Sequence, residues 1–213
     1  MPDILSRSLE LVISAHIDGK LRGRGIPEVL REATDRLSRA GIRYVLAGKL
    51  AYGFYAPAQF TLDIELVAMK SAKAEIQTVF SQMGCIAVED VDHRMTYDAP
   101  ASEVKIHVLM GEVDPEKSAV DDACAAALFN LRLPLIKPEY LLWIYCGSDR
   151  VDRTVDAIAL VKSGTVDLAL LKRRLGGAGD TAAEGQLGVA MVLAEKETSS
   201  SYTATIGRRL QMR

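Results

Sequence analysis

The chain has 213 residues, of which 49% are hydrophobic and 25% are charged, and its formal net charge is −2. These values are typical of a globular protein with one sizeable core and a smaller attachment, and they exclude a generally basic nucleic-acid coat. No stretch reaches the roughly 20 apolar residues that span a bilayer, and three scattered cysteines make neither a disulfide framework nor a zinc site, so we expect a cytoplasmic protein with no membrane partner.

Helices and strands are expected to interleave over the first two-thirds of the chain. Apolar residues recur at helical spacing in some segments and alternate with polar residues in others. The predicted helices cover 4–17, 27–40, 49–55 and 72–83, and the predicted strands cover 43–47, 60–67, 94–97 and 104–109. This interleaving favours an α/β or α+β fold built on a sheet.

The last third of the sequence reads as helical. The predicted helices cover 138–146, 151–162 and 166–175. A flexible break is expected at 176–179, another helix capped by Thr181 follows it, and 198–201 is expected to be a polar linker. We therefore expect a sheet domain with N-terminal helices at 1–135 and a C-terminal helical region at 136–213.

Asp63 and Glu65 stand out in the predicted strand 60–67. Side chains two apart on a strand point to the same side, so both carboxylates leave one face while Ile64 enters the core. Paired carboxylates suit a hard cation such as Mg²⁺, which is usually shared with substrate phosphates in phosphoryl or nucleotidyl transfer. The alternative is an ordinary strand with one solvated face, because an acid-x-acid triplet is common.

Gly48 strengthens the reading of this segment as a phosphate site. It ends one predicted strand and opens a short predicted helix, where backbone N–H groups attract a triphosphate and glycine permits a close approach. The segment from Tyr44 to Leu66 resembles the signature of the DNA polymerase β-like nucleotidyltransferases, and is most similar to their toxin and abortive-infection branch. There a hydrophobic strand ends in Gly-Gly or Gly-Ser, a short helix follows, and Asp-x-Asp lies on the next strand after Thr or Ser.

This resemblance implies a mixed-sheet nucleotidyltransferase-like core with a C-terminal helical part. It implies a nucleoside triphosphate (NTP) substrate and Mg²⁺ or Mn²⁺ bound by Asp63 and Glu65, with Gly48 and Lys49 at the phosphates. The nucleotidyl group would pass to a hydroxyl of RNA or protein. Members of this branch are often the toxin of a toxin–antitoxin pair, so an antitoxin is an expected partner.

A second stretch carries the same resemblance. Residues 135–142 and 150–158 are similar to the part of that branch that follows the sheet, where a Pro-Glu-Asp-Leu helix start precedes an Asp-x-x-x-Asp helix. Asp152 and Asp156 are four residues apart, so they share one face of a helix and are candidates for contact with the nucleotide.

Five positions depart from the family pattern. Lys49 replaces the second small residue, Gln59 replaces an arginine, and Glu65 replaces the second aspartate. Tyr145 replaces a lysine, and His107 stands where a third carboxylate is expected, as a catalytic base or a ligand, although a lone histidine on a strand is more often structural. These departures leave two alternatives open: a catalytically degenerate member that acts as a nucleotide-binding or protein-interaction module, and an unrelated α/β domain.

Overall fold

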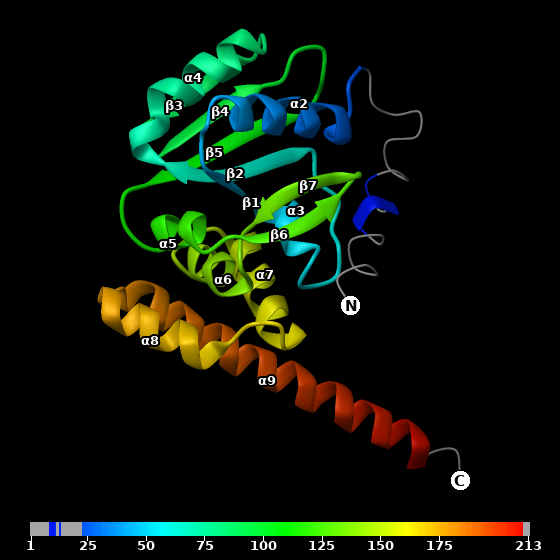
Figure 1. Cartoon of the computed structure of the whole chain (residues 1–213). Coiled ribbons are helices and arrows are strands. Elements are labelled where there is room, and N and C mark those ends of the chain that lie inside the picture. The colour runs from blue at the N-terminus through cyan, green and yellow to red at the C-terminus, as the bar shows by residue number, and fades with distance from the viewer. Residues whose placement is uncertain (1–8, 12, 14–22, 211–213) are drawn as a thin grey trace. The chain divides into compact units, whose positions relative to one another are not determined.

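The computed structural model describes residues 9–11, 13 and 23–210, and for 197–210 it describes the backbone alone (Figure 1). Most of the helix predicted at 4–17 lies outside the described residues. The chain divides into two compact units between Leu141 and Leu142.

The first unit is built on a mixed sheet. Its strands are β1 (Tyr44–Ala47), β2 (Asp63–Met69), β3 (Ile86–Val91), β4 (Arg94–Asp98), β5 (Lys105–Gly111), β6 (Cys124–Leu128) and β7 (Leu131–Leu135). They form a seven-stranded sheet in the order β3-β4-β5-β2-β1-β7-β6. The pairs β2·β5 and β1·β7 are parallel and the other neighbours are antiparallel, which confirms the predicted α/β class with a mixed sheet.

Two helices cover one face of this sheet, and the opposite face carries a polar row at the start of β2. The helices of the unit are α2 (Ile26–Arg39), α3 (Gly48–Tyr52), α4 (Lys73–Gln82) and α5 (Glu116–Asp121), with a 3₁₀ turn at Lys70–Ala72, and α6 (Pro138–Cys146) crosses the division. Figure 1 shows α2 and α4 over the same face. Leu37 of α2 and Phe80 of α4 line one space with Leu66 of β2. The alternation in β2 therefore places Ile64 and Leu66 in the core and turns Asp63 and Glu65 to the opposite face.

Three strands were not predicted, for reasons of local chemistry. β6 consists mostly of alanine, which has low strand propensity, and β3 carries the acidic pair Glu89 and Asp90. β7 contains Pro134, which lacks an N–H group, and only Leu135 of that strand pairs with β1, so little of a ladder is lost. Phe129 and Asn130 join β6 to β7 with φ angles of 50° and 60°, the left-handed pair of a two-residue hairpin.

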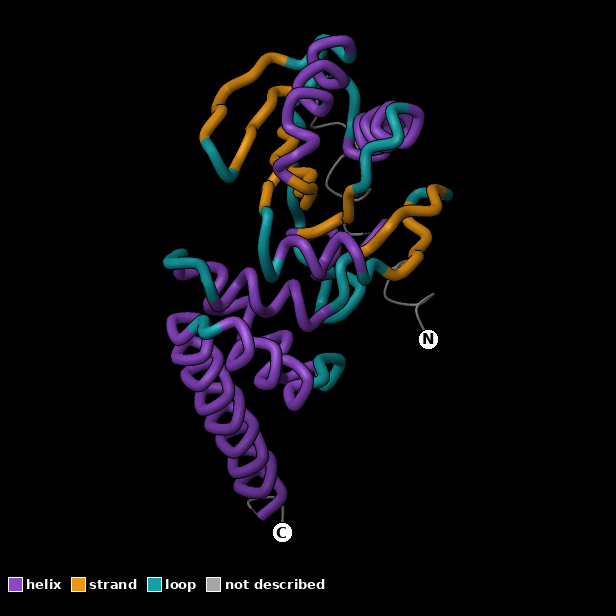
Figure 2. Tube along the Cα trace, turned by 60° about the vertical axis from the view of Figure 1, so that its left-hand side comes forward, coloured by secondary structure: helices purple, strands orange, loops and turns teal. Residues whose placement is uncertain are grey.

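The described part of the second unit contains helices and no strands (Figure 2). Its elements are α7 (Val151–Ser163), α8 (Leu168–Ala178) and α9 (Thr181–Leu210), so the predicted C-terminal helical part is confirmed. The break expected at 176–179 is wrong, because α8 continues to Ala178 and ends at Gly179, whose φ is 68°. The linker expected at 198–201 is also wrong, because α9 runs through it. None of the helices within the described residues is long and apolar enough to cross a membrane.

Candidate functional site

Asp63 lies at the first position of β2, on the face that the helices α2 and α4 leave uncovered. The hydroxyl of Thr61 accepts a hydrogen bond from the Asp63 N–H group at 3.0 Å, which fixes the entry of the chain into the strand. The Asp63 side chain is 46% exposed. Its carboxylate can therefore reach a solute while its backbone is held by the sheet.

Glu65 lies on the same face and packs directly against Gly48. Gly48 has φ +61°, and a Cβ atom there would overlap Cδ and Oε1 of Glu65. Glycine is thus required at this position both by its left-handed backbone and by the approach of the Glu65 carboxyl group. In this conformation Glu65 covers the start of α3, where the sequence predicted a phosphate contact.

Lys49 and Gln59, two of the positions that depart from the family pattern, contact each other. Lys49 Nζ donates a hydrogen bond to Gln59 Oε1 at 2.6 Å and lies 5.4 Å from the centroid of the Tyr52 ring. The Gln59 amide and the Tyr52 ring hold the ammonium group in place. A cation is thereby positioned at the start of α3.

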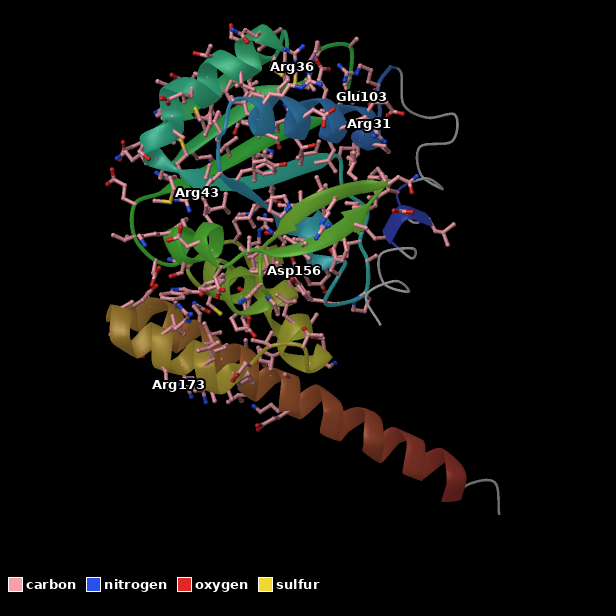
Figure 3. All side chains as sticks on the ribbon, viewed as in Figure 1. Arg31, Arg36, Arg43, Glu103, Asp156 and Arg173 are labelled. Atoms are coloured by element: carbon pink, nitrogen blue, oxygen red, sulfur yellow. The ribbon has the colours of Figure 1, made fainter. Side chains whose placement is uncertain are left out.

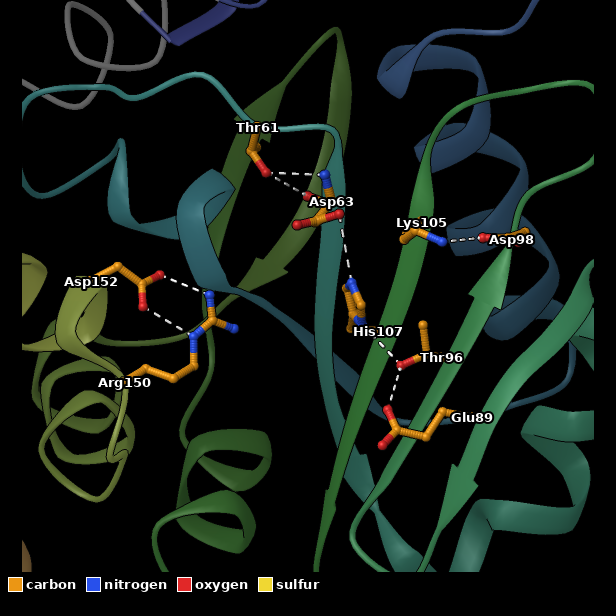
Figure 4. A network of polar contacts seen from close by, with 9 residues as sticks. All are labelled: Thr61, Asp63, Glu89, Thr96, Asp98, Lys105, His107, Arg150 and Asp152. Atoms are coloured by element: carbon orange, nitrogen blue, oxygen red, sulfur yellow. Dashed lines mark hydrogen bonds and ion pairs between the residues drawn. The ribbon is translucent and has the colours of Figure 1, made fainter.

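His107 is brought next to Asp63 by the parallel pairing of β2 with β5. Glu65 pairs with His107 in the register of the two strands, and Asp63 pairs with Lys105. Nε2 of His107 lies 3.6 Å from Oδ1 of Asp63, and Nδ1 lies 3.0 Å from the Thr96 hydroxyl of β4 (Figure 4). The sheet therefore brings together three of the predicted site residues, Asp63, Glu65 and His107.

Thr96 and Glu89 continue this contact chain behind His107, and neither was predicted as a site residue. The Thr96 side chain, in a residue 5% exposed, donates to Glu89 Oε2 at 3.2 Å. Arg94 donates to the other oxygen of Glu89 at 2.7 Å, and this bond is the main cause that holds the pKa of the Glu89 carboxyl below its usual range. A signal was present for Thr96, which alternates with two large apolar residues in a strand, but Glu89 lies in a strand that was not predicted.

The carboxylates fit one divalent ion better than two. Across the residues that the structure describes, no group of three or more His, Cys, Asp or Glu side chains converges as a metal-binding set. Mg²⁺ is commonly held by one or two carboxylates, with phosphate oxygens and water completing its coordination, and Asp63 and Glu65 can supply that pair. A second Mg²⁺ ion would need a further oxygen ligand, and His107, which offers nitrogen instead, occupies the place where the family pattern has a carboxylate.

The other predicted nucleotide contacts, Asp152 and Asp156, lie on α7 in the second unit, and Asp156 is labelled in Figure 3. Their environments differ although they are four residues apart. The Asp152 side chain is 47% exposed and pairs with Arg150 at 2.8 Å, which holds its pKa below the usual range. Asp156 is 1% exposed. In the same unit, the Arg153 guanidinium lies 4.5 Å from the ring centroid of Tyr145, the residue that replaces the lysine of the pattern.

Comparison with known proteins identifies the fold. No protein-family model and no curated protein matches the sequence. The solution structure of the antibiotic-resistance factor ANT(2″)-Ia is similar with a TM-score of 0.50 and 11% identity, covering 87% of this chain and 97% of that chain. The crystal structure of ANT(2″)-Ia in complex with adenylyl-2″-tobramycin gives a TM-score of 0.51 and 11% identity, covering 77% of this chain and 95% of that one. The fold of this chain is accordingly nucleotidyltransferase-like.

Proposed function

We propose that the chain is a nucleotidyltransferase that moves a nucleotidyl group from an NTP to a hydroxyl, with release of pyrophosphate, using one Mg²⁺ or Mn²⁺ ion held by Asp63 and Glu65. The observation that carries this proposal is the position of Asp63. Its carboxylate is partly exposed at the first residue of β2, on the same face as Glu65, in a nucleotidyltransferase-like fold. Because two carboxylates leave most of the coordination of such an ion to phosphate oxygens, the pair is suited to a triphosphate substrate.

The residues around Asp63 would each have a separate role in binding the ion and the NTP. A bound divalent ion neutralises phosphate charge and polarises the phosphoryl oxygen. Asp63 and Glu65 would hold it, and Glu65 would leave its contact with Gly48 as the phosphates approach the glycine. Lys49 would add a positive charge at the phosphates. Asp152, whose side chain is 47% exposed, is a further proposed contact to the nucleotide, and Asp156 could join it only if its buried carboxyl group became accessible.

For the acceptor we propose a hydroxyl of RNA or protein, and for the biological role the toxin of a toxin–antitoxin pair. This part of the proposal is supported by the resemblance of residues 44–66 and 135–158 to the toxin branch of the superfamily. The antitoxin would be a protein partner. The complex of ANT(2″)-Ia with adenylyl-2″-tobramycin makes a small polyol a useful comparison acceptor in the test.

A label-transfer assay tests the function. The purified chain is incubated with each α-³²P-labelled NTP, Mg²⁺ or Mn²⁺, and either total RNA, no added acceptor, or tobramycin. We expect label on RNA or on the protein, and we expect Asp63→Asn to abolish it because the ion loses a charged ligand. Asp98→Asn is the matched control, since Asp98 is 47% exposed and is paired with Lys105, which lies between it and Asp63 in the sheet. Equal transfer by Asp63→Asn and the wild type would contradict the proposal. Label on tobramycin alone would contradict the proposed RNA or protein acceptor and favour a small-molecule acceptor.

The second candidate is a nucleotide-binding or protein-interaction module without transferase activity. Two observations favour it: Glu65 lies against Gly48, and His107 takes the place of a third carboxylate. In the same assay this candidate predicts no label transfer with any acceptor. Retained NTP binding in filter retention would then support the nucleotide-binding module.

A further inference from the structure

The hydrogen bonds behind His107 determine which of its ring nitrogens carries a proton. Glu89 accepts from Arg94 and from the Thr96 hydroxyl, and an ionised carboxylate can only accept. Since the single hydroxyl proton of Thr96 points to Glu89, the hydroxyl oxygen must act as acceptor toward His107. Nδ1 of His107, at 3.0 Å, is therefore the N–H donor.

Nε2 is then the ring nitrogen with a lone pair when the imidazole is neutral. It lies 3.6 Å from Asp63 Oδ1, so two hydrogen-bond acceptor atoms on neighbouring strands face each other (Figure 4). A metal ion about 2.1 Å from each donor can bridge them, because twice that reach exceeds the separation.

We propose that His107 Nε2 and Asp63 Oδ1 together bind one divalent ion of the first transition series, and that Thr96 and Glu89 are positioning residues that hold the imidazole in the required tautomer. A histidine that binds metal through one nitrogen almost always donates its other N–H group to an oxygen partner, which in turn is held by further hydrogen bonds. Thr96 and Glu89 supply that arrangement. This inference rests on the proposed function for the use of the ion, although ion binding is measured without turnover.

The mixed donor set determines which ion is preferred. An imidazole nitrogen favours zinc and its neighbours in the series, whereas Mg²⁺ prefers oxygen ligands alone. We therefore expect Zn²⁺ to bind more tightly than Mn²⁺, and Mn²⁺ more tightly than Mg²⁺. With only two protein ligands, binding should strengthen when a triphosphate adds oxygen ligands.

Nitrogen NMR of the full chain tests the tautomer and the ligand together. Ring nitrogens of the ¹⁵N-labelled protein are recorded at mildly alkaline pH, and His107→Gln assigns the resonances of His107. The expected result is a protonated Nδ1 and an unprotonated Nε2, with Zn²⁺ shifting the Nε2 resonance and Mg²⁺ leaving it in place. A proton on Nε2 in the neutral ring, or an Nε2 resonance that Zn²⁺ does not move, would overturn the inference.

Calorimetry with Zn²⁺ alone and with ATP present tests the positioning residues. Thr96→Val keeps the shape of the side chain but removes the hydroxyl, and it should lower Zn²⁺ affinity about 10-fold or more. Thr96→Ser keeps the hydroxyl and should retain the affinity. Equal affinities for these two variants would contradict the role of Thr96.

These measurements separate the inference from the proposed function. If Zn²⁺ shifts the Nε2 resonance but no NTP gives label transfer, the metal site is supported and the transferase function is contradicted. If His107→Gln leaves Mg²⁺-dependent label transfer unchanged and Zn²⁺ does not shift the Nε2 resonance, the transferase function is supported and this metal site is contradicted.

Discussion

At the scale of the residue, Gly48 is a position where the sequence has little freedom. Its φ of +61° disfavours any L side chain, and the Glu65 carboxyl group fills the space that a Cβ atom would need. Gly41 supplies a comparison in the same unit, since its φ is +69° and nothing lies within 4 Å of a Cβ atom built there. The two glycines therefore separate the cost of the backbone from the cost of the contact.

Alanine substitution at these two glycines measures both costs. We expect Gly41→Ala to lower the free energy of unfolding by about 1–2 kcal/mol through backbone strain alone. Gly48→Ala should lower it by about 1–3 kcal/mol more, because the added methyl group overpacks against Glu65. Urea denaturation monitored by circular dichroism gives both values.

The double variant Gly48→Ala/Glu65→Ala identifies the source of the difference. Removing the Glu65 carboxyl group should restore part of the excess loss, because Cδ and Oε1 are removed while Cβ of residue 65, 2.6 Å from the added methyl group, remains. The two substitutions should therefore be non-additive. Equal losses for Gly41→Ala and Gly48→Ala would show that the Glu65 contact adds nothing.

At the scale of the element, Asp180 links the start of α9 to α6 in the second unit. Its Oδ1 accepts from the Ala183 N–H group at 3.1 Å, so Asp180 and not Thr181 caps the helix. Its Oδ2 accepts from the Trp143 indole at 2.8 Å. The sequence predicted Thr181 as the cap, one residue after the observed one, because threonine is also a good N-cap residue.

Replacing Asp180 should affect stability and fluorescence together. We expect Asp180→Ala to lower the free energy of unfolding by about 2 kcal/mol, from the lost cap and the lost indole hydrogen bond. The chain has one tryptophan, so its emission reports directly on this bond. A shift of the emission maximum in the native state is therefore expected.

Asp167 provides the control for this element. It caps α8 by accepting from the Leu170 N–H group at 2.9 Å. Asp167→Ala should lower stability by about 1 kcal/mol and leave the native emission of Trp143 unchanged. If Asp180→Ala behaved in the same way as this variant, the Trp143 bond would have no energetic role.

At the scale of the whole molecule, the fold was predictable where hydrophobic periodicity was strong. The alternation in β2 predicted which of its side chains enter the core, and the pattern at 138–146 predicted α6 to the residue. The hairpin of β6 and β7 was not predictable, because its alanines and Pro134 resemble a loop and only pairing within the sheet makes them strands.

Site residues that are close in sequence could be predicted, but contacts between residues on different strands could not. The sequence pointed to Asp63, Glu65 and Gly48 because they lie within one short motif. It could not show that Glu65 rests on Gly48, that Lys49 contacts Gln59, or that Thr96 and Glu89 support His107. Those contacts depend on which strands are neighbours and on their register, which no local pattern specifies.

The central claim is that Asp63 anchors a metal-dependent nucleotide site, and equilibrium binding of the NTPs tests it most directly. Each NTP is titrated into the full chain with Mg²⁺ or Mn²⁺ and again with the metal chelated, using the wild type, Asp63→Asn and Asp98→Asn. We predict that at least one NTP binds in a metal-dependent way, and that Asp63→Asn weakens this binding about 10-fold or more while Asp98→Asn does not. Binding that is absent with every NTP and metal, or equal in the two variants, would contradict the claim.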